Sequence, residues 1–189
     1  MTHIVWESVE EPGIEHLDLH LDPQGGRADG LQVRVLDGGP IRLRYAVAWD
    51  GLWRVRRVTL ALDGFRQGSL ELTSNGEGHW SDGAGADLAH LAGCLDVDIL
   101  ASPFTNTLPI RRLLFAPGKP QNIAVAYISV PDLRITRAPQ RYTFLGSQNG
   151  RPVYRYENVE TGYTADLPVD SKGVVWDYPE YFRRVWPQA

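Results

Sequence analysis

Apolar and polar residues alternate with a two-residue period over much of this chain. In GIEHLDLHLD, residues 13–22, the leucines fall on one face of an extended backbone and the histidines and aspartates fall on the other. The same period recurs in residues 31–35 and 41–49, and an Asp-Gly turn signal precedes a returning strand at residues 53–62. This period predicts a protein built mainly of antiparallel strands.

Shorter segments of the same kind extend the predicted sheet. NIAVAYISV, residues 122–130, is apolar on both faces, as in a central strand that is covered on each side. Nineteen glycines and 13 prolines are scattered between the apolar segments, which indicates many turns rather than disorder. The further strands that we expect lie at residues 69–73, 94–100, 108–115, 123–130, 141–146, 153–157, 163–169 and 173–176.

The final segment, DYPEYFRRVW, predicts a short helix. Asp177 can cap it, Glu180 completes a capping-box pattern, and Pro179 falls in the first turn, where proline is tolerated. Helical spacing gathers an aromatic face that has to be buried against a sheet. The residues of this face are Tyr178, Tyr181, Phe182, Val185 and Trp186. We therefore expect a mainly β (α+β) fold, one domain over residues 1–189, with a short C-terminal helix packed on a many-stranded antiparallel sheet.

Composition excludes several classes of protein. The net charge is -4 and the sequence pI is about 5.7, so the chain has no basic field to hold a phosphate backbone, and nucleic acid is not an expected partner. The single cysteine, Cys94, cannot form an internal disulfide. The N-terminal residues lack the pattern of a secretion signal, and no apolar run approaches the roughly 20 residues of a membrane helix. We expect a soluble, cytoplasmic protein.

Two aspartates stand one residue apart in CLDVDIL, residues 94–100. In a strand, Asp96 and Asp98 share one face and lie about 6.6 Å apart. Like charges that are this close and partly shielded would raise the pKa of one carboxyl, or recruit a cation or a hydroxyl-rich ligand. The alternative is an ordinary solvated outer face, since alternating strands usually have a polar side.

The residues that follow, SPFTNTLPIRR, offer hydroxyl and amide groups that both donate and accept hydrogen bonds. Thr105 and Asn106 are therefore candidate partners for sugar hydroxyls, although a plain turn uses the same residue types. Pro109 indicates a bulge or an edge strand. Arg112 is an even number of residues from the apolar residues of the predicted strand, so it would lie on their buried face. A buried guanidinium needs a carboxylate or several acceptors.

Two charged residues fall on faces that are otherwise apolar. Glu15 shares its parity with the leucines of residues 13–22, and Arg56 shares its parity with the apolar residues of 58–62. A carboxylate in such a place must be paired, protonated or exposed to a polar cavity. Either both residues belong to a binding pocket, or they form structural pairs or lie at strand ends where parity means little.

Other apparent motifs fail on geometry. His16 and His20 have metal spacing only on a helix; in a strand they lie roughly 13 Å apart and cannot share an ion. The glycines at residues 83–85 do not form a dinucleotide-binding loop, and Cys94 has no activating base near it in the sequence. We therefore predict no catalytic residue, no metal ligand and no cofactor.

Several segments together resemble the bacterial putative glycolipid-binding family, long catalogued as a domain of unknown function. The resemblance runs from Glu15 to the C-terminal segment, and the segments that carry it are CLDVDI, SPFTNTLPIRRL, VAYISVPDL, QRYT and VDSKGVVWDYPEYF. It implies a sheet curled as a β-roll around a helix, a tight homodimer and an acidic pocket, with no established reaction. The family fold has a remote likeness to periplasmic lipoprotein localisation factors. Parity and motif position place the acidic pocket at Glu15, Asp96 and Asp98.

The favoured hypothesis is non-enzymatic binding of a glycolipid or related sugar-bearing amphiphile. Carboxylates would accept hydrogen bonds from sugar hydroxyls, and Tyr142 or Trp53 would stack on sugar faces. The full set of candidate ligand-binding residues is Glu15, Arg56, Asp96, Asp98, Thr105, Asn106, Arg112 and Tyr142. The first alternative is an enzyme that acts on glycosidic bonds, because a separation near 6.6 Å lies at the lower edge of the inverting range of about 6.5–9.5 Å. The second alternative is a structural dimer module with an aromatic interface.

Overall fold

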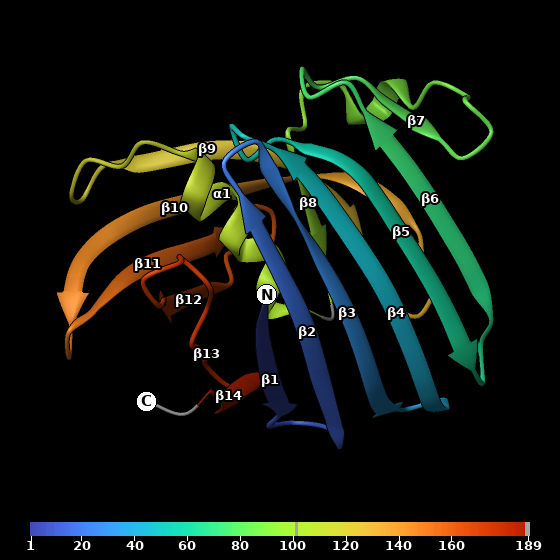
Figure 1. The fold of residues 1–189 in the computed structure, drawn as a ribbon, viewed down its shortest axis with the longest axis horizontal. Helices are drawn as coiled ribbons and strands as arrows, with labels where there is room; N and C mark the ends of the chain where they lie inside the picture. Colours follow the sequence, from blue (N-terminus) through green and yellow to red (C-terminus); the bar gives the residue numbers. More distant parts are fainter. Residues whose placement is uncertain (101, 188–189) are drawn as a thin grey trace.

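Two curved sheets face each other across a short helical segment and form a β-roll (Figure 1). The computed structural model describes residues 1–100 and 102–187. Within these residues the larger sheet has nine strands, which neighbour one another in this order: β13 (Asp177–Tyr178), β14 (Phe182–Trp186), β1 (Thr2–Ser8), β2 (Gly13–Asp22), β3 (Gly25–Leu36), β4 (Gly39–Asp50), β5 (Val55–Gly64), β6 (Gly68–Ser74) and β7 (Trp80–Asp82).

The smaller sheet has five strands in the described residues. Their order is β12 (Thr164–Pro168), β11 (Arg151–Asn158), β10 (Ile135–Gln148), β9 (Pro120–Ile128) and β8 (Asp96–Ile99). All pairs in both sheets are antiparallel except β8 with β9, which run parallel. The mainly β, antiparallel roll predicted from the sequence is confirmed.

The predicted alternation decides which faces are buried. Leu17 and Leu19 of β2 are almost fully buried, and the intervening His16 and Asp18 lie on the outer face of the larger sheet. Strands β4 and β5 repeat this pattern. In β3 the predicted face is reversed: Val33 and Val35 are exposed, and Ala28 and Gln32 are buried instead. The hairpin at the Asp-Gly turn is present as the antiparallel pair of β4 and β5.

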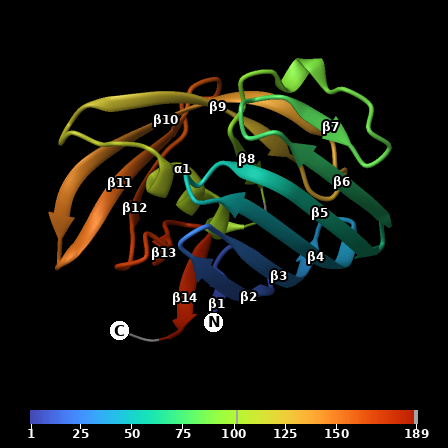
Figure 2. The same cartoon turned by 45° about the horizontal axis from the view of Figure 1, so that its top comes forward.

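The helical segment lies between the two sheets (Figures 1 and 2). A 3₁₀ turn, η2 (Pro103–Asn106), leads directly into α1 (Thr107–Arg112). Phe104 and Leu108 of this segment are completely buried. The roll therefore curls around a short helix, but this helix is in the middle of the chain.

The predicted strand at residues 108–115 is wrong. The hydroxyl of Ser102 accepts a hydrogen bond from the backbone N–H of Phe104 at 3.2 Å and so caps the start of η2. Pro109 falls in the first turn of α1, where it needs no N–H partner. An apolar run this short fits a strand or a helix equally well. The capping by Ser102 and the position of Pro109 therefore decide for the helix.

The predicted C-terminal helix is also wrong, because residues 177–186 form a hairpin. The Asp177 side chain does not cap a helix; it accepts from the backbone N–H of Arg184 at 2.9 Å across the hairpin. Glu180, in the turn, has a φ of 72°. Aromatic and β-branched residues suit strands, and β14 gains a partner by pairing with β1.

The C-terminal hairpin brings the two ends of the described chain together. In the pairing of β14 with β1, Phe182 lies opposite Ser8 and Arg184 lies opposite Trp6. A further predicted strand at residues 173–176 is reduced to an isolated bridge between Val169 and Val175.

Arg56 departs from its predicted position because β5 is bulged. The register between β4 and β5 shifts where Trp49 pairs with Val55 and Ala48 pairs with Arg57. The extra residue, Arg56, is turned outward and is exposed, while Val55 and Val58 on either side are buried. A bulge interrupts the alternation of inward and outward side chains. The prediction that Arg56 lies on the same face as Val58 was therefore wrong.

Candidate functional site

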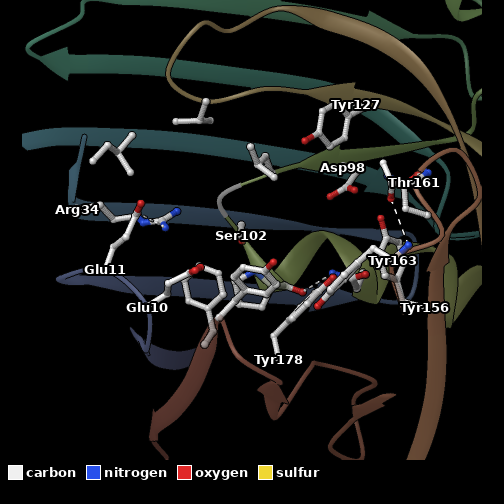
Figure 3. A pocket seen from close by; sticks show the side chains of 18 residues that line it. Glu10, Glu11, Arg34, Asp98, Ser102, Tyr127, Tyr156, Thr161, Tyr163 and Tyr178 are labelled. Carbon is white, nitrogen blue, oxygen red and sulfur yellow. Dashed lines mark hydrogen bonds and ion pairs between the residues drawn. The ribbon is translucent and has the colours of Figure 1, made fainter. Parts of the chain in front are cut away.

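The described residues form a pocket of about 400 Å³ between the two sheets (Figure 3). Asp98 and Leu100 reach it from the end of β8, and Ser102 and Asn106 reach it from η2. Its aromatic wall comes from the smaller sheet and the C-terminal hairpin, and the tyrosines in it are Tyr127, Tyr156, Tyr163, Tyr178 and Tyr181. A cavity of this size is typical of sites that hold a small ligand.

Asp98 is the acidic group at the inner end of the pocket. Its carboxylate accepts hydrogen bonds from the Thr105 hydroxyl at 3.0 Å and from the Gln140 amide at 2.7 Å. The side chain is partly exposed, and it lines the pocket. Burial raises the pKa of Asp98 above its ordinary value, and the bonds from Gln140 and Thr105 oppose that rise only in part.

Asp96, two residues earlier on the same strand, has a different environment. It is completely buried, and the Arg112 guanidinium contacts it at 2.5 Å and 3.0 Å. Burial raises the pKa of Asp96, and Arg112 opposes the rise. The predicted carboxylate partner of Arg112 is therefore present, although Arg112 comes from α1 rather than from a strand. Asp96 does not line the pocket formed by the described residues.

Glu15 lies directly behind the pocket wall. It is completely buried and accepts hydrogen bonds from the Tyr45 hydroxyl at 2.5 Å, from Ser102 at 2.7 Å and from Gln32 at 2.8 Å. Burial raises the pKa of Glu15 to about 7, because these bonds only partly replace the water that the carboxylate has lost. Ser102 lines the pocket, so one side chain separates Glu15 from it.

The segment Ser102–Asn106 therefore joins the two groups of acids. Ser102 donates to Glu15 of the larger sheet, and Thr105 donates to Asp98 of the smaller sheet. Asn106 lines the pocket, and its side-chain oxygen accepts from the Tyr142 hydroxyl at 2.8 Å. The structure thus brings Glu15, Asp98 and this segment into one hydrogen-bonded region.

The predicted stacking aromatics lie elsewhere. Tyr142 is 1% exposed and lies behind Asn106, so a ligand in the pocket cannot stack on its ring. Trp53 stacks on Trp49 with ring centroids 5.1 Å apart, outside the pocket. Arg56 is also outside it: its guanidinium donates to the carbonyl of Ser74.

Sequence reasoning missed most of the pocket wall. The aromatic residues near the C-terminus were assigned to a helix face, and no local pattern shows that Tyr127 and Tyr156 meet them across the roll. Gln140 had a detectable signal: it is a polar residue, 1% exposed, between buried Ala138 and Tyr142 on β10. The parity rule that identified Glu15 would have found it.

One set of side chains on the described part of the chain has the donor types and proximity that a metal ion requires. His3 of β1 and His16 and Asp18 of β2 place one ligand atom each within 4.8 Å of one another. They lie on the outer face of the larger sheet, where His3 pairs with Asp18 in register. None of the three lines the pocket.

Comparisons with known proteins give one consistent relationship. A family model described as Putative glycolipid-binding matches residues 3–184. The crystal structure of a DUF1089 family protein from Pseudomonas aeruginosa is similar to this chain, with a TM-score of 0.81 and 37% identity, over 90% of this chain and 92% of that one. A comparison with curated proteins gave no match.

No helix among the described residues has the length and apolar character needed to cross a bilayer. The family match spans nearly all of both sheets, the helical segment and the pocket. This chain belongs to the Putative glycolipid-binding family.

Proposed function

We propose that the protein binds a glycolipid or a related sugar-bearing amphiphile in the pocket between its sheets, without catalysing a reaction. The observation that carries this proposal is the combination of polar and aromatic groups in one cavity. Asp98, Ser102 and Asn106 form a polar inner end, and tyrosines form much of the wall. The family description, which names putative glycolipid binding, supports the same ligand class.

The polar groups suit a sugar headgroup. Sugar hydroxyls both donate and accept, so they can donate to Asp98 and exchange hydrogen bonds with the amide of Asn106. The Tyr127 hydroxyl is protonated at neutral pH and able to donate, and burial raises its pKa further, to about 12. Tyrosine rings offer flat apolar faces to the C–H groups of a sugar ring.

Apolar side chains at the same pocket suit a lipid tail. Leu36, Val130 and Phe182 line it together with Leu100, which is 53% exposed. An exposed leucine beside a polar cavity gives an alkyl chain a surface to contact where it leaves the pocket. An amphiphile would satisfy both kinds of lining.

The alternative of a glycoside-cleaving enzyme with Asp96 and Asp98 as its paired carboxylates has less support. The acid and the base of such an enzyme must flank the scissile bond. Asp96 is fully buried in its pair with Arg112, outside the lining of the pocket. It is therefore not placed to act on a ligand that Asp98 contacts.

Native mass spectrometry of the protein purified from its own cells tests the proposal. The wild-type protein is expected to retain a lipid that organic extraction releases. Thr161→Trp places a large ring at an exposed residue of the pocket lining and is expected to abolish retention. Thr164→Trp is the matched control, because Thr164 is exposed but does not line the pocket. Equal retention by both variants would contradict binding in this pocket.

Two further expectations stay predictions. The homodimer implied by the family resemblance is tested by sedimentation velocity, where a monomer at all micromolar concentrations would contradict it. The cytoplasmic location is tested by cell fractionation with an antibody to the native protein.

A further inference from the structure

The two aspartates of β8 differ in how their negative charges are compensated. Asp96 contacts a cation, the guanidinium of Arg112. Within the part of the chain that the structure describes, the hydrogen bonds to Asp98 come from the neutral hydroxyl of Thr105 and the neutral amide of Gln140. Over residues 1–100 and 102–187, no lysine, arginine or histidine nitrogen lies within 4.0 Å of the Asp98 carboxylate. Asp98 is the one of the two that faces the pocket.

A carboxylate that is largely, though not completely, withdrawn from water is costly without a cation, and neutral donors offset only part of that cost. The same protein places a cation, Arg112, against the neighbouring carboxylate of Asp96. At Asp98 the open side of the carboxylate faces the cavity instead. The missing positive charge can therefore come from a ligand.

The remaining charges of the pocket do not supply it. Among the described lining residues, three are acidic (Glu10, Glu11 and Asp98) and one, Arg34, is basic. Arg34 is paired with Glu11 at 3.0 Å. Figure 3 shows Arg34, Glu10 and Glu11 at one end of the pocket and Asp98 at the other. The lining as a whole thus carries an excess of negative charge.

The aromatic wall of the pocket also favours a positively charged ligand. Tyr156 packs near Tyr163 and Tyr178 with ring centroids 6.3 Å and 6.4 Å apart, and Tyr178 meets Tyr181 edge to face at 5.6 Å. Figure 3 shows Tyr127 next to Asp98, and the charge of Asp98 also contributes to the raised pKa of Tyr156. The faces of aromatic rings attract cations, and clusters of such rings beside a carboxylate are suited to ammonium groups.

We infer that the headgroup bound in this pocket carries a positively charged amine, as an amino sugar does, and that the amine contacts Asp98. This inference rests on the proposed function, because it specifies the ligand of the same pocket. Hydroxyls alone would complete the hydrogen bonds of Asp98 and leave its charge without a counter-charge. An ammonium group supplies both, since each of its N–H groups donates.

Three alkyl glycosides with the same chain provide the test by isothermal titration calorimetry, each below its critical micelle concentration. They are octyl glucoside, its 2-amino-2-deoxy analogue and the N-acetylated form of that analogue. The amine is expected to bind about tenfold more tightly than the other two. This is the gain expected from one contact of the ammonium with the Asp98 carboxylate together with its attraction to the tyrosine rings. Equal affinity for all three overturns the inference and leaves the proposed function standing. Binding of none overturns both.

Asp98→Asn locates the preference within the pocket. The substitution removes the charge and keeps the size of the side chain, so the variant is expected to bind the amine and the parent glycoside equally. Asp63→Asn is the matched control, because Asp63 is an exposed aspartate on β5 outside the pocket. An amine preference that persists in Asp98→Asn would overturn the assignment to Asp98. The comparison of the three ligands on wild-type protein stands even where a variant does not fold.

Discussion

The hydroxyl of Ser102 donates to Glu15 at 2.7 Å and so joins η2 to the larger sheet, across 87 residues of sequence. On the other side of η2, Thr105 donates to Asp98 of the smaller sheet. One short segment therefore holds an acid from each sheet. The position of the pocket depends on these contacts, and the first predictions concern them.

Glu15 is expected to make folding stability depend on pH. Its pKa is raised from 4.5 to about 7 in the folded protein, so the folded state binds the proton more tightly than the unfolded state. The contribution of Glu15 to the free energy of unfolding should fall as pH rises from about 4.5 to about 7, by about 3 kcal/mol, and change little above that range.

Glu15→Gln should remove this slope, because glutamine does not titrate and Gln32 can turn its amide to match it. Urea denaturation at a series of pH values measures the difference between the variant and the wild type. Glu77→Gln, at an exposed position, serves as the control and should keep the wild-type slope. Parallel pH profiles for wild type and Glu15→Gln would contradict the buried, raised-pKa state of Glu15.

The ion pair of Arg112 with Asp96 is expected to be structural. Arg112→Met leaves a fully buried carboxylate without its cation and should lower the free energy of unfolding by about 3–5 kcal/mol. Adding Asp96→Leu should restore much of the loss. Arg155→Met breaks an exposed pair, with Asp166, and should cost about 1 kcal/mol or less. Chemical denaturation distinguishes these outcomes, and similar losses at the two sites would refute the burial argument.

Tyr142→Phe should weaken ligand retention although Tyr142 does not line the pocket. The substitution removes the donor to Asn106, leaves a buried acceptor without that bond and should cost about 1–2 kcal/mol of stability. Because Asn106 lines the pocket, the retained lipid should also decrease in native mass spectra. Tyr154→Phe, at a half-buried tyrosine of the same sheet outside the pocket, should leave retention unchanged.

Gly30 is expected to tolerate no side chain. A Cβ on Gly30 would lie 2.1 Å from the ring of Tyr45, which donates to Glu15. Gly30→Ala should therefore displace Tyr45 and lower the free energy of unfolding by about 1–3 kcal/mol. At Gly68 an added Cβ would meet only the end of the Leu133 side chain, at 3.2 Å. A thermal melt of Gly68→Ala should differ little from wild type, whereas equal melting temperatures for Gly30→Ala and wild type would contradict the close packing.

The two-residue period was sufficient to predict β2 to β6 of the larger sheet and the buried position of Glu15. It did not predict β1 or β7, and it assigned the wrong face of β3 to the core. It fails where local geometry changes the period. A bulge turned Arg56 outward, and a capped turn made residues 103–112 helical. Residues 177–186 satisfied a helical pattern, but the segment pairs with β1 instead, and a helix of that length is only marginally stable by itself.

The sequence predicted one acid of the pocket, Asp98, and little of its walls. Glu15 and Asp96 do not line the pocket, and its other acids, Glu10 and Glu11, were not predicted. Asp98 and its donor Thr105 lie close in sequence, so a local motif could suggest them. Tyr127 and Tyr178 meet at the pocket only because the smaller sheet and the C-terminal hairpin face each other. Such meetings depend on the topology of the sheets, which alternation within single strands does not encode.

The pairing of β14 with β1 makes the pocket depend on residues that are far apart in the sequence. Tyr178, Tyr181 and Phe182 line the same cavity as Glu10 and Glu11. A partly folded chain in which β14 has separated from β1 would therefore lose part of the cavity lining. Ligand occupancy would then report whether these two strands are paired.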